Sequence, residues 1–156
     1  MIRYDIPEKE TLVIEHLILD FNGTIAEDGM LIPGVADRVR DLASRVTVHV
    51  ITADTNGSAR AQVADLPCRV EIIGKHGQDQ AKLAYAENLG LDNVAAIGNG
   101  RNDALLLKNA ALGIAVIQAE GAAAEALSAA RIICTGINDA LDLLLRPPRL
   151  TATLRN

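Results

Sequence analysis

Near the start of the chain, the residue best suited to chemistry is Asp20, a carboxylate that directly follows a short apolar run. It comes after residues 17–19, Leu-Ile-Leu, and before the turn 21–24, Phe-Asn-Gly-Thr. A carboxylate at a strand tip, beside a turn that contains glycine, can approach an anion while backbone N–H groups of the turn point at it. Asp20 is therefore a candidate nucleophile or metal ligand, and the alternative is that it only caps a turn.

Two later segments also place polar side chains after apolar runs. Thr52 ends the run 46–52, Asn99 follows the run 93–97, and Asp103 comes four residues after Asn99. In an open α/β sheet, ligands collect beyond the carboxyl ends of the strands, so we expect these side chains to gather with Asp20. The alternatives are a hydroxyl that caps a turn at Thr52 and a simple turn at Asn99.

One lysine is a candidate for the cation at this edge of the sheet. Lys82 lies in the first turns of a helix predicted to begin at residue 78. The alternative is a solvated helix residue, in which case Lys75, in a loop flanked by glycines, is the competing candidate.

The elements that must position these residues alternate between strand and helix from residue 46 onwards. Apolar, β-branched runs predict strands, and apolar residues at helical spacing predict helices. The predicted strands are 46–52, 69–73, 93–97, 113–117 and 131–134, and the predicted helices are 35–45, 56–65, 78–89, 103–110, 121–130 and 138–145. Repeated units of this kind indicate an α/β fold with a mostly parallel sheet covered on both faces.

Both ends of the chain have a different character. Residues 2–6 and 11–20 predict an N-terminal hairpin that runs into a long first strand, and Asp28-Gly29 predicts a second hairpin turn. Pro147-Pro148 is expected to stop the last helix. We therefore predict one domain over 1–146 and a basic C-terminal tail over 147–156, solvated unless a neighbouring subunit holds it.

Composition restricts the classes of partner. The 156 residues are 49% hydrophobic, which fits one domain. A net charge of −5 and only three aromatic residues disfavour a nucleic-acid partner. Apolar runs fall short of the roughly 18 to 20 residues that span a bilayer, and the first residues do not resemble a signal peptide, so we expect no membrane partner and a cytoplasmic location.

Cysteine and histidine do not suggest a metal site. Cys68 and Cys134 share no metal-ligand spacing and are interpreted as reduced structural thiols. His16 and His49 occupy strand positions and are interpreted as core or edge residues.

Residues 20–24 resemble the first motif of the haloacid dehalogenase-like hydrolase superfamily, in which the aspartate is the nucleophile. Further matches follow in the expected order at Thr52, at Lys82 and at residues 98–103, Gly-Asn-Gly-Arg-Asn-Asp. The first and last matches also resemble motifs of the P-type ATPases. Over residues 12–145 the pattern is similar to the small soluble, P-type-ATPase-like members, which implies a three-layer, Rossmann-like fold.

The resemblance also implies a catalytic role for each matching residue. Asp20 would attack a phosphoryl group and form an aspartyl-phosphate, which divides one difficult displacement into two easier ones. The Thr52 hydroxyl and the Lys82 charge would bind phosphoryl oxygens, as phosphoryl transfer requires. The implied phosphate-binding residues are Gly23, Thr24, Thr52, Lys82 and Asn102.

The same resemblance implies a Mg²⁺ cofactor. The ion would be held by the carboxylates of Asp20 and Asp103 and the backbone carbonyl of Asn22, with Asn99 close by or bound through water. Hard oxygen ligands suit this ion, which keeps several waters.

Two positions depart from the family pattern. Asn22 stands where phosphatases of this superfamily usually have an aspartate that protonates the leaving group and then activates water. An amide cannot transfer a proton, so acid-base catalysis worth about 10²- to 10⁴-fold is expected to be missing. Asn99 stands where the later motif normally has aspartate, so we expect modest affinity for Mg²⁺.

The resemblance therefore implies a Mg²⁺-dependent phosphohydrolase acting on a small phosphorylated substrate or a phosphoprotein. About two dozen residues separate Thr52 from Gly77, too few for a cap domain. Members without caps often oligomerise, so we expect an open site or one that a second subunit of a homo-oligomer covers. The rival hypotheses are a non-catalytic phosphate-sensing or partner-binding module, and a detached pump domain that needs a transmembrane partner.

Overall fold

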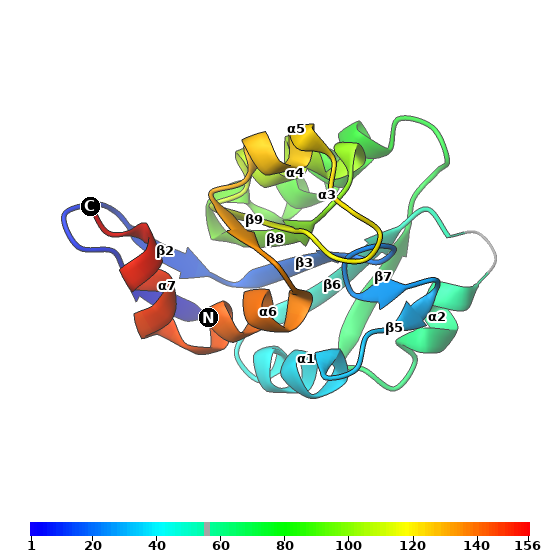
Figure 1. Cartoon of the computed structure of the whole chain (residues 1–156), viewed down its shortest axis with the longest axis horizontal. Coiled ribbons are helices and arrows are strands. Elements are labelled where there is room, and N and C mark those ends of the chain that lie inside the picture. Colours follow the sequence, from blue (N-terminus) through cyan, green and yellow to red (C-terminus); the bar gives the residue numbers. More distant parts are fainter. Residues whose placement is uncertain (55–56) are drawn as a thin grey trace.

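Apolar segments of the chain form a six-stranded sheet with the strand order β10-β9-β8-β3-β6-β7 (Figure 1). The computed structural model describes residues 1–54 and 57–156. All neighbouring pairs in this sheet are parallel, as predicted. Its strands are β3 (His16–Asp20), β6 (Thr47–Thr52), β7 (Cys68–Ile72), β8 (Val94–Gly98), β9 (Leu112–Val116) and β10 (Ile132–Cys134).

Helices cover both faces of the sheet, which confirms the three-layer α/β prediction (Figure 1). On one face, a core around Ile18 and Ile51 packs against α3 (Gln78–Leu89), α4 (Ala104–Asn109) and α5 (Ala124–Ala129). On the other face, a larger core around Leu17 and Leu19 packs against α1 (Val35–Ala43), α2 (Ser58–Gln62) and α6 (Ile137–Leu145). Adjacent residues of β3 thus contribute to opposite cores, because side chains alternate along a strand.

The predicted long first strand is divided at Glu15. The N-terminal strands β1 (Ile2–Asp5) and β2 (Thr11–Ile14) pair with each other in an antiparallel hairpin, whereas β3 enters the main sheet. The backbone of Glu15 donates to the Asn93 carbonyl and accepts from the Thr47 amide, both at 2.9 Å. Glu15 therefore joins the two sheets, and the prediction of one strand over 11–20 is wrong.

The C-terminal segment forms a helix, α7 (Pro147–Leu154), so the prediction of a solvated tail is wrong. The two prolines begin this helix, where an amide hydrogen would have no partner within the helix. Leu150 is completely buried, and α7 packs against β1 and α6 (Figure 1). Burial of Leu150 stabilises the packing of this helix on the rest of the protein. The basic, polar composition of the segment gave no sign of this contact.

Some helix boundaries also differ from the prediction. The helix predicted over 121–130 begins at Ala124, because residues 121–123 form a loop whose Ala123 amide donates to the Asn99 carbonyl at 2.8 Å. The helix predicted over 103–110 is preceded by a 3-10 turn, η2 (Arg101–Asp103), and a similar turn, η1 (Leu91–Asn93), precedes β8. The predicted helix start at residue 56 lies outside the described residues.

A second hairpin, β4 (Ala26–Glu27) and β5 (Met30–Leu31), turns at Asp28-Gly29 as predicted. Both turn residues have positive φ, 49° and 79°, which matches the twist of a two-residue hairpin. The hairpin lies against α2, where the Leu31 amide donates to Gln62 Oε1 at 2.9 Å. This short hairpin is the insertion that follows the 20–24 loop.

Two smaller predictions can also be compared with the structure. Cys68 and Cys134 are both free thiols, as predicted. Among the helices of the described ranges, none combines the length and the apolar character needed to span a membrane.

A partly buried polar chain links β3, β6 and α3 through His16, His49 and Tyr85. His49 has no exposed surface, as predicted for a core residue, and its two ring nitrogens lie 3.1 Å from His16 Nδ1 and 2.8 Å from the Tyr85 hydroxyl. Burial, with smaller contributions from His16 and Arg69, lowers the pKa of His49 to about 4. His49 is therefore neutral in the folded protein at neutral pH.

Acidification should destabilise the fold through His49. Because the pKa is lower in the folded chain than in the unfolded chain, the unfolded state binds the extra proton first, and stability falls as the pH falls from about 6.5 towards 4. Denaturant titrations should show that the wild type loses about 2 kcal/mol more than His49→Gln between pH 7 and pH 5. Parallel losses in both proteins would contradict this assignment.

Candidate active site

The candidate site lies where the strand order of the main sheet reverses. β3 is central and pairs with β6 on one side and β8 on the other, with Asp20 beside Ile51 and Leu19 beside Ile97. The carboxyl ends of the three strands therefore reach the same edge, which is where ligands bind in such sheets. A cavity of about 470 Å³ opens there, lined by Asp20, Asn22, Thr52, Ala53, Asp54, Ser58, Gln78, Lys82, Asn99, Gly100 and Asn102.

The ammonium group of Lys82 lies between two carboxylates at the floor of this cavity. Lys82 Nζ donates to Asp20 Oδ1 at 2.7 Å and to Asp103 Oδ1 at 2.6 Å. The side chains of Lys82 and Asp103 are 1% exposed, and that of Asp20 is 12% exposed. Of the two lysines that the sequence left open, the structure therefore places Lys82 beside Asp20.

The buried charges alter one another's protonation. Burial and the Asp103 charge raise the pKa of Asp20, and the Lys82 ammonium opposes them. Burial lowers the pKa of Lys82, but the two carboxylates outweigh it and leave that pKa above its usual value. Lys82 is therefore a fixed cation, and it lowers the free energy of the ionised form of Asp20, which is the nucleophilic form.

The 20–24 loop is held by its own hydrogen bonds. The amides of Thr24 and Ala26 donate to the Phe21 carbonyl, and the Gly23 amide donates to the Ala26 carbonyl. Gly23 has a φ of 74°, and a β-carbon there would collide with the Asn99 side chain. The Gly23 and Thr24 amides therefore already donate hydrogen bonds within the loop. Their role in phosphate binding stays a prediction, and in this structure they would contribute through the shape of the loop.

The hydroxyl of Thr24 connects the loop to the neighbouring strand end. Thr24 Oγ1 lies 2.9 Å from Asp20 Oδ2 and 3.2 Å from Asn99 Oδ1. Together with Lys82, this contact fixes both oxygens of the Asp20 carboxylate.

Asp103 organises the loop after β8. Its Oδ2 accepts the amides of Asn99 at 3.1 Å and Gly100 at 2.9 Å, while its Oδ1 accepts from Lys82. A β-carbon at Gly98 would collide with this carboxylate, which explains the glycine at the strand end. Asp103 does not line the cavity, so its direct contact with a metal stays a prediction, whereas its contacts with Lys82 and the loop are present.

The oxygens that face the cavity suit a hard divalent cation. Asn99 Nδ2 donates to the Gly121 carbonyl at 3.0 Å, and Asn99 Oδ1 lies 3.2 Å from the Thr24 hydroxyl, which also contacts Asp20. Asn22 lines the cavity beside them. Within residues 1–54 and 57–156, no cluster of three His, Cys, Asp or Glu side chains forms a metal site, so a cation here would use amide or carbonyl oxygens besides carboxylates.

Thr52 lies at the end of β6 and is 3% exposed. Its Oγ1 accepts a hydrogen bond from the Asp54 amide at 3.2 Å, so Thr52 caps the turn, which was the alternative interpretation. Thr52 also lines the cavity, where it could bind phosphate, and that role stays a prediction. Asp54 Oδ2 in turn accepts from Ser58 Oγ and the Ala59 amide, both at 2.6 Å, and holds the start of α2.

Sequence reasoning missed three residues around the site. Gln78 lines the cavity and accepts from Asn102 Nδ2 at 2.7 Å, and Asp54 lines it two residues beyond Thr52. Gln118 donates to the carbonyls of Gly23 and Thr24 at 3.2 and 2.8 Å and so holds the 20–24 loop. Gln118 comes two residues after β9, so the rule that located Asp20 at a strand end could have found it.

The arrangement brings together the residues that the sequence predicted. Asp20, Asn22, Thr52, Lys82, Asn99 and Asn102 surround one cavity. It presents the Asp20 carboxylate, the Lys82 ammonium and a set of polar oxygens, a combination that could bind an anionic group and transfer it to Asp20.

Comparisons with known proteins show which family and which fold this chain resembles. Residues 77–140, which include Lys82 and Asp103, match the family described as haloacid dehalogenase-like hydrolase. Uncharacterized protein MJ0073 of Methanocaldococcus jannaschii is 51% identical over 87 residues, which cover 53% of this chain and 94% of that protein. Uncharacterized protein MJ0072 of the same organism is 42% identical over 40 residues, 26% of this chain and 91% of that protein.

Two solved structures share the fold. The 3-deoxy-D-manno-octulosonate 8-phosphate phosphatase of Moraxella catarrhalis, in complex with a magnesium ion, a phosphate ion and KDO, has a TM-score of 0.72 and 17% identity, over 86% of this chain and 87% of that one. The cobalt-bound deoxy-D-mannose-octulosonate 8-phosphate phosphatase of Haemophilus influenzae has a TM-score of 0.71 and 15% identity, over 90% of this chain and 92% of that one. At these identities the likeness concerns the fold.

Proposed function

Because the chain belongs to the haloacid dehalogenase-like hydrolases, we propose that it hydrolyses phosphate monoesters through an aspartyl-phosphate on Asp20. The observation that carries this proposal is the Lys82 ammonium, 2.7 Å from Asp20 Oδ1 and 2.6 Å from Asp103 Oδ1 at the buried end of a polar cavity. A lysine held in this way supplies a fixed positive charge where phosphoryl oxygens would lie.

In the first step, an oxygen of the Asp20 carboxylate forms a bond to phosphorus while the bond between phosphorus and the leaving oxygen breaks. The electron pair of that bond departs with the leaving group. Thr52 and Lys82 bind the phosphoryl oxygens on which charge is distributed, and the Asp103 carboxylate and the Thr24 hydroxyl keep Lys82 and Asp20 in place.

In the second step, water attacks phosphorus, the bond between phosphorus and Asp20 breaks, its electron pair returns to the carboxylate, and a proton of the water passes to solvent. A carboxylate at position 22 would take the proton from this water, but the Asn22 amide cannot. We therefore expect slow hydrolysis of the intermediate, and slow departure of leaving groups that need a proton.

The residues present fit a Mg²⁺ ion. Asp20, the backbone of Asn22 and the Asn99 amide oxygen would hold it, and Asp103 is the further carboxylate predicted to do so. When bound, the ion supplies positive charge that stabilises the phosphoryl group in the transition state. Two carboxylates and one ammonium give this cluster a net negative charge, which favours a cation.

We propose that the substrate is a small phosphorylated molecule. The part of the cavity lined by Thr52 and Lys82 is buried, while Asn22 on the same cavity is exposed. A phosphoprotein partner and a homo-oligomer that covers the entrance remain predictions for separate tests.

Beryllium fluoride with Mg²⁺ should raise the melting temperature. A trifluoroberyllate on Asp20 mimics the phosphorylated carboxylate, and a ligand that binds only the folded state stabilises it by mass action. At a hundredfold excess over Kd, differential scanning fluorimetry should show a shift on the order of 5 °C or more.

Asp20→Ala should abolish this shift, whereas Asp65→Ala, which removes an exposed carboxylate away from the cavity, should keep it. A shift that survives Asp20→Ala would mean that the anion binds elsewhere. A shift at Asp20 without any hydrolysis of phosphate esters would support the rival hypothesis of a phosphate-sensing module.

A further inference from the structure

A second cavity of about 510 Å³ adjoins the candidate active site. It is lined by Lys75, Gln78, Asp79, Arg101 and Asn102, and it shares Gln78 and Asn102 with the first cavity. Those two side chains are joined by the 2.7 Å hydrogen bond between Asn102 Nδ2 and Gln78 Oε1. A leaving group that extends from a phosphate at Asp20 past this pair would enter the second cavity.

The two cavities differ in charge. The second cavity contains two cations, Lys75 and Arg101, and one anion, Asp79, whereas the first contains Asp20 and Asp54 against Lys82. The whole chain carries a net charge of −5. The net positive charge of the second cavity, beside the site of Asp20, therefore does not simply reflect the overall composition. The first turn of α3 forms part of the same wall and adds the positive end of a helix dipole.

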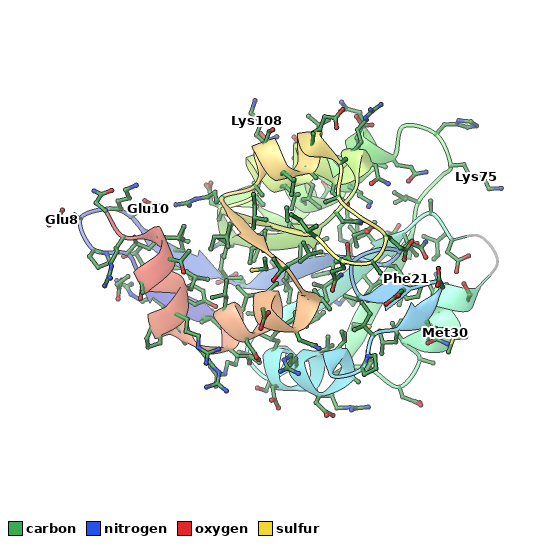
Figure 2. The ribbon with its side chains drawn as sticks, in the orientation of Figure 1. Glu8, Glu10, Phe21, Met30, Lys75 and Lys108 are labelled. Carbon is green, nitrogen blue, oxygen red and sulfur yellow. The ribbon has the colours of Figure 1, made fainter. Side chains whose placement is uncertain are left out.

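Both cations are available to a ligand. Lys75 is exposed on the loop between β7 and α3 (Figure 2), and none of the ion pairs within residues 1–54 and 57–156 involves it. Arg101 pairs with Glu125 at 3.0 Å, but their side chains are 81% and 49% exposed. Such exposed pairs contribute little free energy, so the Arg101 guanidinium can exchange Glu125 for an anion.

We propose that the natural substrate is a phosphate monoester whose leaving group carries a second anionic group, and that Lys75 and Arg101 bind that group. This inference rests on the proposed function, because it places the first phosphate at Asp20. The second group is a carboxylate or a second phosphate, which Arg101 recognises through paired N–H donors and Lys75 through its point charge.

Matched substrates test this proposal. Gluconate 6-phosphate and glucitol 6-phosphate differ only in a terminal carboxylate, and fructose bisphosphate and fructose monophosphate differ only in a second phosphate. We expect kcat/KM to be at least about tenfold higher for the anionic member of one pair, since each cation at contact distance in water contributes about fivefold. The pair with the larger ratio identifies the second group.

Substitutions that remove positive charge and a substitution that removes negative charge should have opposite effects if the second cavity recognises charge. A general loss of structure would instead lower activity in every variant. Lys75→Gln combined with Arg101→Gln should bring the ratio of anionic to neutral substrate close to one, whereas Asp79→Asn should raise it by about fivefold. Lys108→Gln, on the exposed surface of α4 away from Lys75 (Figure 2), should leave the ratio unchanged. A wild-type ratio near one, or a ratio that the double substitution does not change, would overturn the proposal.

Binding measurements distinguish failure of this inference from failure of the proposed function. In an Asp20→Asn background, calorimetry gives the Kd of each substrate without turnover. If no phosphate ester is hydrolysed by the wild type, including p-nitrophenyl phosphate, the proposed function is wrong. Even then, a lower Kd for the anionic member of a pair that is lost with Lys75→Gln and Arg101→Gln would support the proposed anion site. Equal Kd values for both members of each pair would refute the anion site.

Discussion

Lys82→Met should lower kcat for p-nitrophenyl phosphate by about 10²- to 10³-fold, the usual effect of removing one electrostatic contact to the transition state. Methionine keeps the length of the side chain but removes the cation that lies between Asp20 and Asp103. Because Lys82 opposes the rise in the Asp20 pKa, its loss should raise that pKa further. The acid limb of the pH–rate profile should therefore move to higher pH.

The same substitution leaves two neighbouring carboxylates buried without their counterion. Breaking a buried ion pair in this way costs about 3 to 5 kcal/mol unless a carboxylate takes up a proton. A thermal melt therefore has to accompany the kinetics, and activity is compared only for folded protein. Lys108→Met, at an exposed position, is the matched control, and folded Lys82→Met with near wild-type kcat would contradict the assigned role.

Asn22→Asp should increase hydrolysis of an alkyl phosphate such as glycerol phosphate by about 10- to 10³-fold. Asn22 lines the cavity beside Asp20 and is exposed, so a carboxyl group there can reach the leaving oxygen and the attacking water. An aryl phosphate departs without a proton and should gain less. The ratio of aryl to alkyl kcat/KM should therefore fall in the variant.

A control separates acid-base chemistry from added charge. Asn102→Asp adds the same charge on another part of the same cavity wall; because Asn102 is a predicted phosphate-binding residue, this variant should lower both rates and should not raise alkyl phosphate hydrolysis. If the wild type already hydrolyses alkyl phosphates as fast as aryl phosphates, and Asn22→Asp changes neither rate, then another residue supplies the proton.

The location of the site could be predicted because it depends on short-range patterns. Apolar runs followed by Asp20, Thr52 and Asn99 identify strand ends, and parallel strands bring those ends to one edge. The sequence could not distinguish Lys82 from Lys75, because both follow the same strand. That distinction depends on the helix: five residues into α3 the Lys82 side chain turns inward, whereas Lys75 lies on the exposed loop before it.

Other features depend on contacts between segments far apart in the chain. Asp103 stays a predicted metal ligand, and its contact with Lys82, 21 residues away in the chain, could not be predicted from the local sequence. The helix over 147–154 is stabilised because Leu150 is buried where α7 packs on β1 and α6. The residues of this segment alone do not predict that contact. The division of the first strand at Glu15 similarly depends on hydrogen bonds to Asn93 and Thr47.

The most direct test of the account is to trap the phosphoryl group on Asp20. Without a proton acceptor at position 22, hydrolysis of the aspartyl-phosphate should be slow and the intermediate should accumulate during turnover of p-nitrophenyl phosphate with Mg²⁺. Borohydride reduces an acyl phosphate to an alcohol, so quenching with borohydride and mass spectrometry of the peptide containing residue 20 should reveal homoserine there. We expect homoserine at position 20 in the wild type and less of it in Asn22→Asp. An unmodified Asp20 in wild-type protein that is actively hydrolysing the substrate would contradict it.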